Sequence, residues 1–174
     1  AGDPPPGEEA PPPSEQELAY ALDLVELVRE VGDFSVGVAA HPELHPRSPD
    51  RASDREHLAA KLAVADFGVT QFFFRASHYL AMVDELAALG VTTPILPGIM
   101  PVTNAGQVKR FAEMAGAEFP ADLAERLVAA SDDPAEVRRI GVEVATELCQ
   151  ELLDAGVPGL HFYTLNRSTA TREI

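Results

Sequence analysis

Polar side chains stand at the ends of three apolar segments of this chain, where they could bind a ligand. Gln71 lies in the segment 67–74, whose other residues have the bulky, apolar character of a strand buried on both faces. His41 and His45 follow a second such segment, and residues 163–167 (YTLNR) end a third. A buried amide is costly unless it is paired, either with neighbouring backbone or with a ligand. The carboxyl ends of parallel strands are where α/β proteins bind ligands, so three polar groups at one edge favour a binding site.

The two histidines also raise the alternative of a metal-dependent lyase or hydrolase. His41 and His45 are four residues apart with Glu43 between them. On a helix this spacing puts two ligands on one face. Pro42 and Pro46 make the segment a loop, however, so the helical argument fails. Hydrogen bonds from the imidazoles to a ligand, or within the loop, fit the sequence better, and we predict no metal.

Few groups could bind phosphate. The chain has neither common glycine-rich phosphate loop, so this role would fall to Lys61 or to a helix N-terminus at Asp54. A solvated Lys61 is the alternative. Phe111 and Phe119 could pack on a planar ligand, although membership of the hydrophobic core is favoured for both.

Strand-like and helix-like patterns alternate along the chain. Residues 1–13 are rich in proline and predict an extended loop. The strands are expected at 34–40, 67–74, 94–100 and 159–164. The helices are expected to be capped or opened by Ser14 (with Glu17), Asp54, Ser77, Asn104, Pro120 and Asp133. This alternation predicts an α/β fold with right-handed crossovers and a parallel sheet.

Composition restricts the partners and the compartment. The 174 residues suit one domain, 1–174, and their 13 basic and 28 acidic side chains give a net charge of −15. That charge would repel nucleic acid and anionic membranes. Cys149 is the only cysteine, which is typical of a reducing compartment, and its helical pattern predicts a buried thiol. Since no apolar run approaches the roughly 20 residues that span a bilayer, we expect a soluble cytoplasmic protein.

Five segments in order resemble the 5,10-methylenetetrahydrofolate reductase family, over essentially the whole chain. They are 1–6 (AGDPPP), 38–46 (VAAHPELHP), 69–74 (VTQFFF), 97–102 (PGIMPV) and 161–167 (HFYTLNR). The resemblance implies a (β/α)8 TIM barrel, of which this chain supplies about the last four β/α units. It also implies reduction of 5,10-methylenetetrahydrofolate to 5-methyltetrahydrofolate. In that family NADH or NADPH gives a hydride to FAD and leaves, and the folate then takes the hydride at the same face.

The resemblance also implies roles for individual residues. Asp3 would touch the folate pterin and tune the flavin, and Gln71 would hydrogen-bond the pterin and help to seat the nucleotide. The positions that match FAD contacts are Gly2, Asp3, Tyr20, Ala21, His41, His45, Asp54, His57 and Lys61. The positions that match folate contacts are Asp3, Gln71, Gln107, Phe111, Tyr163, Leu165 and Arg167. An amide can pair with a pterin edge, and Arg can bind a carboxylate.

The sequence also departs from the family pattern. His41 stands where many relatives have Tyr, His57 where several have Asn, and Ala1 and Ala60 replace basic residues. Four strands cannot close a barrel, which usually takes about 250 residues. We therefore expect a longer enzyme, whose N-terminal half supplies the other strands and the family's general acid, a glutamate. Methylenetetrahydrofolate and a second copy of the protein are the other expected partners. A non-catalytic, folate-binding half-barrel is the remaining alternative.

Overall fold

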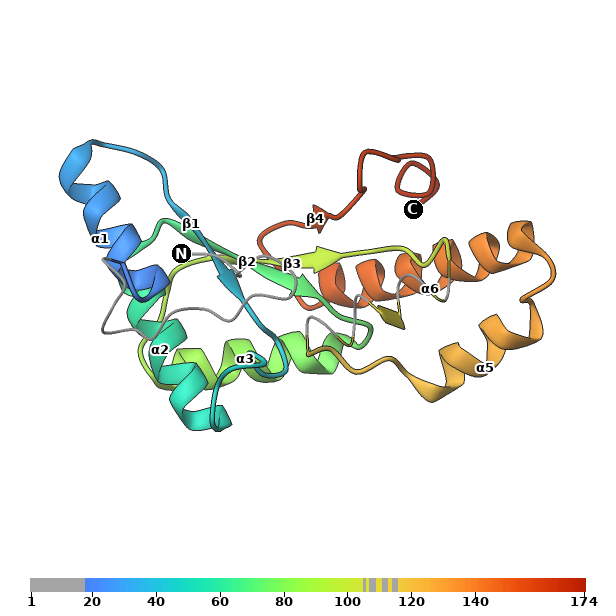
Figure 1. Ribbon diagram of the computed structural model, residues 1–174, viewed down its shortest axis with the longest axis horizontal. Helices are drawn as coiled ribbons and strands as arrows, with labels where there is room; N and C mark the ends of the chain where they lie inside the picture. The colour runs from blue at the N-terminus through green and yellow to red at the C-terminus, as the bar shows by residue number, and fades with distance from the viewer. Residues whose placement is uncertain (1–17, 105, 107–108, 111–112, 114–115) are drawn as a thin grey trace.

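A computed structural model describes most of the chain (Figure 1). The described residues are 18–104, 106, 109–110, 113 and 116–174. The predicted loop 1–13 and the capping box of Ser14 and Glu17 lie outside them. Four parallel strands, each paired with the next along the chain, form one sheet in this part of the protein. The strands are β1 (Gly37–Ala40), β2 (Phe67–Phe72), β3 (Ile95–Ile99) and β4 (His161–Phe162). The predicted parallel α/β fold is confirmed.

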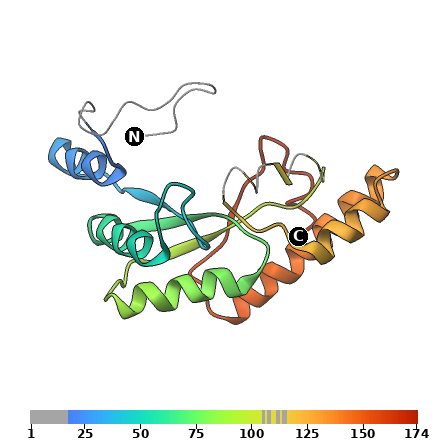
Figure 2. The ribbon, with the colours of Figure 1, turned by 60° about the horizontal axis from the view of Figure 1, so that its bottom comes forward.

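Helices α2, α3 and α6 cover one face of this sheet, with α1 beside α2 (Figures 1 and 2). The helices that lie wholly within the described residues are α1 (Ala21–Val31), α2 (Arg51–Val64), α3 (Ala76–Ala88), α5 (Ala121–Ala129) and α6 (Pro134–Asp154). Asp133 accepts hydrogen bonds from the backbone of Ala135 and Glu136 at the start of α6, as its place before Pro134 predicts. Of the described helices, none is long and apolar enough to cross a membrane.

Three helix starts differ from the predictions. Asp50, not Asp54, caps α2, and accepts a hydrogen bond from Ser53 N at 2.8 Å. Ser77 lies inside the first turn of α3, which starts at Ala76. Helix α1 starts at Ala21, because Asp23 accepts from Tyr20 N at 2.8 Å and so closes the end of the helix there.

All four strands are shorter than predicted, β1 and β4 by the most residues. Strand β1 begins at Gly37 rather than Phe34, because Asp66 takes the place of a ladder partner at Val36. Asp66 N donates to Val36 O (2.9 Å), and Val36 N donates to Asp66 Oδ2 (2.6 Å). Strand β4 ends at Phe162, before a tight turn. The sequence predicts that β2 is buried on both faces. This prediction is wrong, because alternate residues of the strand stay partly exposed.

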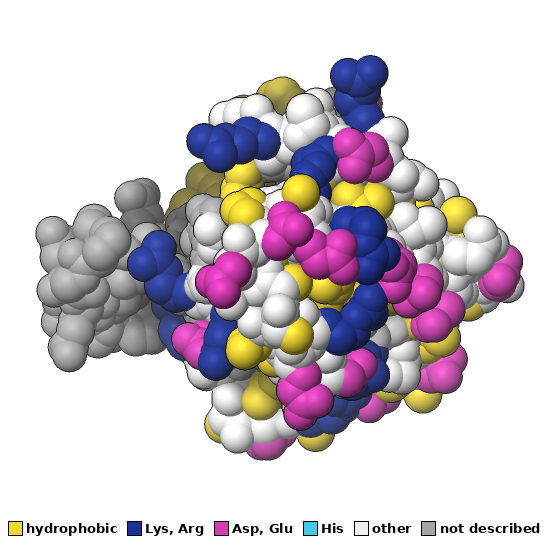
Figure 3. Space-filling model, turned by 90° about the vertical axis from the view of Figure 1, so that its right-hand side faces the viewer, with side chains coloured by type: hydrophobic (Ala, Val, Ile, Leu, Met, Phe, Trp, Pro, Cys, Tyr) yellow, Lys and Arg dark blue, Asp and Glu magenta, His cyan; other side chains and the backbone are white. Residues whose placement is uncertain are grey.

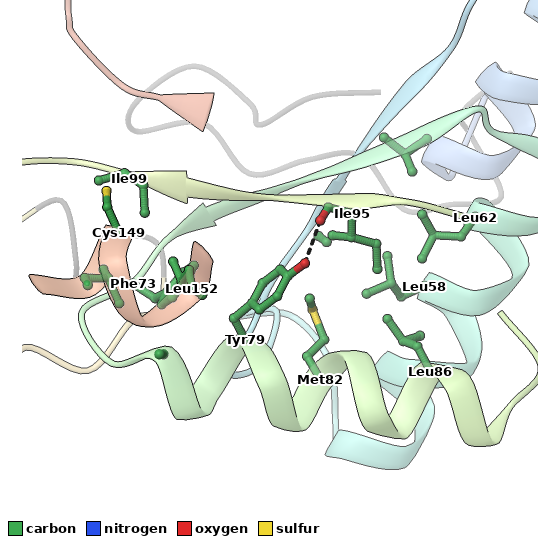
Figure 4. Packing of buried hydrophobic residues seen from close by; sticks show 14 of the residues in the cluster. Leu58, Leu62, Phe73, Tyr79, Met82, Leu86, Ile95, Ile99, Cys149 and Leu152 are labelled. Atoms are coloured by element: carbon green, nitrogen blue, oxygen red, sulfur yellow. Dashed lines mark hydrogen bonds between the residues drawn. The ribbon is translucent and has the colours of Figure 1, made fainter. Parts of the chain in front are cut away.

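The core lies between the sheet and its helices (Figure 4). Leu62, Met82 and Leu152 bring α2, α3 and α6 together there, each fully buried, and each contributes about 1.5–3 kcal/mol by leaving water. The hydroxyl of Tyr79 donates to Ile95 O at 2.7 Å, which satisfies the one polar group of that ring. Cys149 is buried as predicted, and burial raises the pKa of its thiol.

The surface around α5 and the first half of α6 mixes the two signs of charge (Figure 3). Arg139 pairs with Glu136 and Glu143 at 2.7 and 2.6 Å, and Arg126 also reaches Glu143 at 2.6 Å. Exposed pairs of this kind stabilise a protein by only about 0–1 kcal/mol each. This face therefore carries no single-sign patch despite the acidic composition.

Candidate functional site

The structure brings the polar groups after β1 and those in β2 to one edge of the sheet. A narrow, half-open crevice there is lined by the turn His41–Leu44, by Gln71 and Phe72, and by Gly116 and Ala117. Gly116 has a positive φ of 69°, and a Cβ at this position would lie 3.0 Å from Leu44 O. The close approach of residue 116 to the β1 turn therefore requires glycine.

Gln71 lies in a bulge of β2. Val69 is paired with Leu96, but Phe72 is paired with Gly98, so β2 has one residue more than β3 over this stretch. The bulge also reverses the two faces of the strand. A Cβ at Gly68 would contact Leu62 of α2, whereas after the bulge Phe73, and not Phe72, joins the helix-side core. Bulges next to binding sites re-aim a side chain.

Two side chains satisfy the backbone at the bulge. Thr70 Oγ1 accepts from Gly98 N at 2.8 Å, and the Tyr163 hydroxyl donates to Thr70 O at 2.9 Å. Burial raises the pKa of Tyr163, so its phenol stays protonated and can donate at neutral pH. The ring also meets Phe72 edge to face, with centroids 6.2 Å apart. Tyr163 therefore ties the end of β4 to the Gln71 bulge.

A strained turn follows Tyr163. Leu165 and Asn166 have φ of 49° and 62°, and Arg167 N donates to Thr164 O at 2.8 Å. Asn adopts this left-handed region readily, but for Leu it costs about 1–2 kcal/mol. Leu165 is nevertheless 57% exposed. A strained and exposed apolar side chain at the edge of the sheet is typical of a ligand contact.

The turn after β1 is held by a buried ion pair. Asp54 accepts from His45 N (3.3 Å) and Ser48 Oγ (2.8 Å), and its other oxygen lies 2.6 Å from Arg55. The rings of His41 and His45 meet edge to face at 4.5 Å. Sequence reasoning missed Arg55. The signal was present, since Arg55 occupies an apolar position three residues before the buried Leu58.

Glu43 does not form a group of possible metal ligands with His41 and His45. Its carboxylate accepts from Glu118 N at 2.8 and 3.1 Å, and lies 3.2 Å from His78 Nδ1, without hydrogen-bond geometry. The described residues contain one group of three possible metal ligands, Glu43, His78 and Glu118, and neither His41 nor His45 belongs to it. The alternative of a His41, Glu43 and His45 metal centre therefore lacks the geometry it needs.

Lys61 is half-buried, whereas the alternative to phosphate binding in the sequence analysis is a fully solvated side chain. Its ammonium donates to Ala39 O at 3.0 Å, and burial lowers its pKa against the opposing effect of Asp54. Phe119 packs edge to face on Phe74, with centroids 5.1 Å apart, and belongs to the core as favoured.

The other predicted site residues are either exposed or not described. Tyr20, Ala21, His57 and Arg167 are exposed. Gly2, Asp3, Gln107 and Phe111 lie outside the described residues.

Known proteins match the whole chain. A family model described as methylenetetrahydrofolate reductase matches residues 1–174. The chain is 40% identical over 159 residues to 5,10-methylenetetrahydrofolate reductase of Escherichia coli (strain K12), covering 91% of this chain and 54% of that protein. It is 38% identical over 177 residues to a probable methylenetetrahydrofolate reductase (NADPH) of Caenorhabditis elegans, covering 99% and 26%. The chain thus spans about half the length of the bacterial relative.

A solved structure shares the fold at low identity. It is an uncharacterized protein from Clostridium thermocellum that binds two copies of 5-methyl-5,6,7,8-tetrahydrofolic acid. The TM-score is 0.59 at 15% identity, over 88% of this chain and 55% of that one. At this identity the likeness shows the fold alone.

Proposed function

Because the chain belongs to the methylenetetrahydrofolate reductase family, we propose that it forms part of an oxidoreductase that reduces 5,10-methylenetetrahydrofolate to 5-methyltetrahydrofolate. Residues 1–174 would be the C-terminal portion of the catalytic (β/α)8 barrel. The sequential parallel order β1-β2-β3-β4 supports this, since barrel strands follow one another in this way. The remaining strands, and the general acid, would come from the N-terminal half of a longer enzyme.

The observation that carries the proposal is the bulge at Gln71. It re-aims an uncharged donor and acceptor beside the β1 turn, and an amide suits the mixed edge of a pterin. Tyr163 braces the bulge, and Leu165 and Arg167 follow it along the same edge. In this proposal the folate contacts are Gln71, Tyr163, Leu165 and Arg167, together with Asp3, Gln107 and Phe111.

The donors after β1 and along α2 fit a flavin dinucleotide. The Lys61 ammonium donates one of its three N–H groups to Ala39 O. The other two could donate to a phosphate or ribose oxygen. His41, His45 and His57 would add imidazole donors, and Gly2, Asp3, Tyr20 and Ala21 would complete the contacts. Asp54 fits this role less well, because both of its oxygens are engaged within the protein. FAD, when bound, supplies a two-electron carrier between NADH or NADPH and the folate.

A visible spectrum of the full-length protein tests the proposal. We expect a flavin absorbance that bleaches with NADH or NADPH and recovers when methylenetetrahydrofolate is added. A protein that binds folate but whose flavin bleaches with neither nucleotide would instead be a binding module. A stoichiometric divalent metal without flavin would support the lyase or hydrolase alternative.

A further inference from the structure

Arg55 uses every hydrogen-bond donor it has, although its side chain is only 4% exposed. A guanidinium carries five N–H groups. Each one has an acceptor at 2.6–3.2 Å. The acceptors are Glu85 Oε2, Asp54 Oδ2 and the carbonyl oxygens of His41, Pro42 and Glu43. Three consecutive carbonyls of the β1 turn therefore converge on one side chain.

The charge of Arg55 is balanced within a four-residue network. Asp54 and Glu85 neutralise Arg55, while Arg51 also pairs with Glu85, at 2.7 Å. Burial alone would raise the pKa of Glu85, but hydrogen bonds from Arg51 and Arg55 outweigh it and lower that pKa. A buried ion costs stability unless its partners are complete. Here they are complete, and they join α2, α3 and the β1 turn.

The network fixes the main chain at both histidines of the turn. Arg55 binds the carbonyl of His41, and Asp54 accepts from the amide of His45. The backbone positions from which the two imidazoles project are therefore fixed, and the two rings are in edge-to-face contact. An apolar side chain at this position of α2 would avoid the cost of burying a charge. It would, however, remove the donors of His41 O and Pro42 O and leave Glu43 O with Arg51 alone, at 3.3 Å.

We propose that Arg55 is a positioning residue for the flavin, acting through the turn His41–His45. This inference rests on the proposed function. Loss of the guanidinium would let the turn relax, and the imidazoles would no longer stand where the dinucleotide needs them. Misplacement of binding groups by about 1 Å is enough to weaken function strongly.

The test compares three variants of the full-length protein by FAD titration, followed by flavin fluorescence and visible circular dichroism. Arg55→Met keeps the length of the side chain and removes all donors, and we expect its Kd for FAD to rise about tenfold or more. Arg55→Lys should give a smaller rise. Arg51→Met is the control. Arg51 shares Glu85 with Arg55 and also donates to Glu43 O at 3.3 Å, but it is 47% exposed, and we expect a change below about threefold.

Thermal unfolding of the apoproteins separates positioning from folding. An Arg55→Met protein that is folded at the assay temperature and binds FAD with wild-type affinity and dichroism would overturn the inference. If Arg55→Met does not fold, the decision passes to Arg55→Lys, for which unchanged affinity is again the negative result. A wild-type protein that binds no FAD would overturn the proposed function as well, whereas wild-type binding with unaffected variants overturns this inference alone.

Discussion

The Tyr163 hydroxyl donates to the carbonyl oxygen of Thr70, 93 residues earlier in the chain, at 2.9 Å. The bond crosses β3, because Tyr163 follows β4 and Thr70 belongs to β2. Gly98 of β3 makes room for it. A Cβ at residue 98 would lie 2.3 Å from Thr70 O and 2.7 Å from Cε2 of Tyr163.

Gly98→Ala should therefore disrupt the Gln71 bulge. Backbone cannot yield to a contact of 2.3 Å, so we expect a loss of about 1–3 kcal/mol in the free energy of unfolding, measured in urea. Gly159→Ala is the matched control, because its Cβ would meet only Leu96 Cδ2, at an ordinary 3.5 Å. Equal losses in the two variants would show that the crossing does not depend on glycine.

Gln71→Glu should impair the folate half-reaction more than it impairs FAD binding. The change removes the amide donor and adds a negative charge beside the proposed pterin position. We expect reoxidation of the reduced flavin by methylenetetrahydrofolate to slow about tenfold or more, as the loss of a hydrogen bond to a charged or buried group implies. Stopped-flow absorbance measures this rate.

Gln150→Glu controls for the added charge on the exposed part of α6 and should leave both half-reactions unchanged. An equal loss of FAD affinity in Gln71→Glu would mean that Gln71 supports the flavin or the fold rather than the pterin.

The wild-type protein should lose stability at alkaline pH because of Tyr79, and Tyr79→Phe should remove this loss. Burial raises the pKa of Tyr79 to about 12, from a reference value of 10.0. Below pH 10 both folded and unfolded chains hold the proton, so the stability is unaffected there. Between pH 10 and about 12 only the unfolded chain releases it, which costs the folded state up to about 1.4 kcal/mol per pH unit.

The phenylalanine variant should also lose about 1 kcal/mol at neutral pH, because Ile95 O loses its donor. Unfolding free energies at pH 8 and pH 11 measure both effects. If wild type and variant weaken equally over this interval, Tyr79 does not titrate on unfolding as stated.

The approximate positions of the four strands could be predicted from sequence because they depend on local pattern. The start of α2 could not, since Asp50 and Asp54 are both suitable caps. What separates them is tertiary: the oxygens of Asp54 are taken by Ser48, His45 and Arg55. A sequence-based rule for caps does not include such partners.

Gln71 could be singled out from sequence, but the geometry around it could not. The bulge depends on a hydroxyl that comes from 93 residues away. Arg55 was hidden for a related reason, since its acceptors are main-chain carbonyls, which every residue possesses. Only the fold shows which carbonyls lack a ladder partner and where a guanidinium can reach them.

Leu165→Gly should raise stability and weaken folate binding. Glycine adopts φ of 49° without strain, so the free energy of unfolding should rise by up to about 1 kcal/mol. The variant also loses the exposed side chain that we propose contacts the folate, and we expect the KM for methylenetetrahydrofolate to rise several-fold, roughly the value of burying one methylene group.

Asn166→Gly separates the two effects. Asn166 also has a positive φ, 62°, but Asn tolerates this region, so its replacement should change stability by only a few tenths of a kcal/mol. Because Asn166 is not a proposed contact, its KM should stay at the wild-type value. A Leu165→Gly enzyme that is more stable and keeps its KM would mean that the strain at Leu165 serves the turn alone.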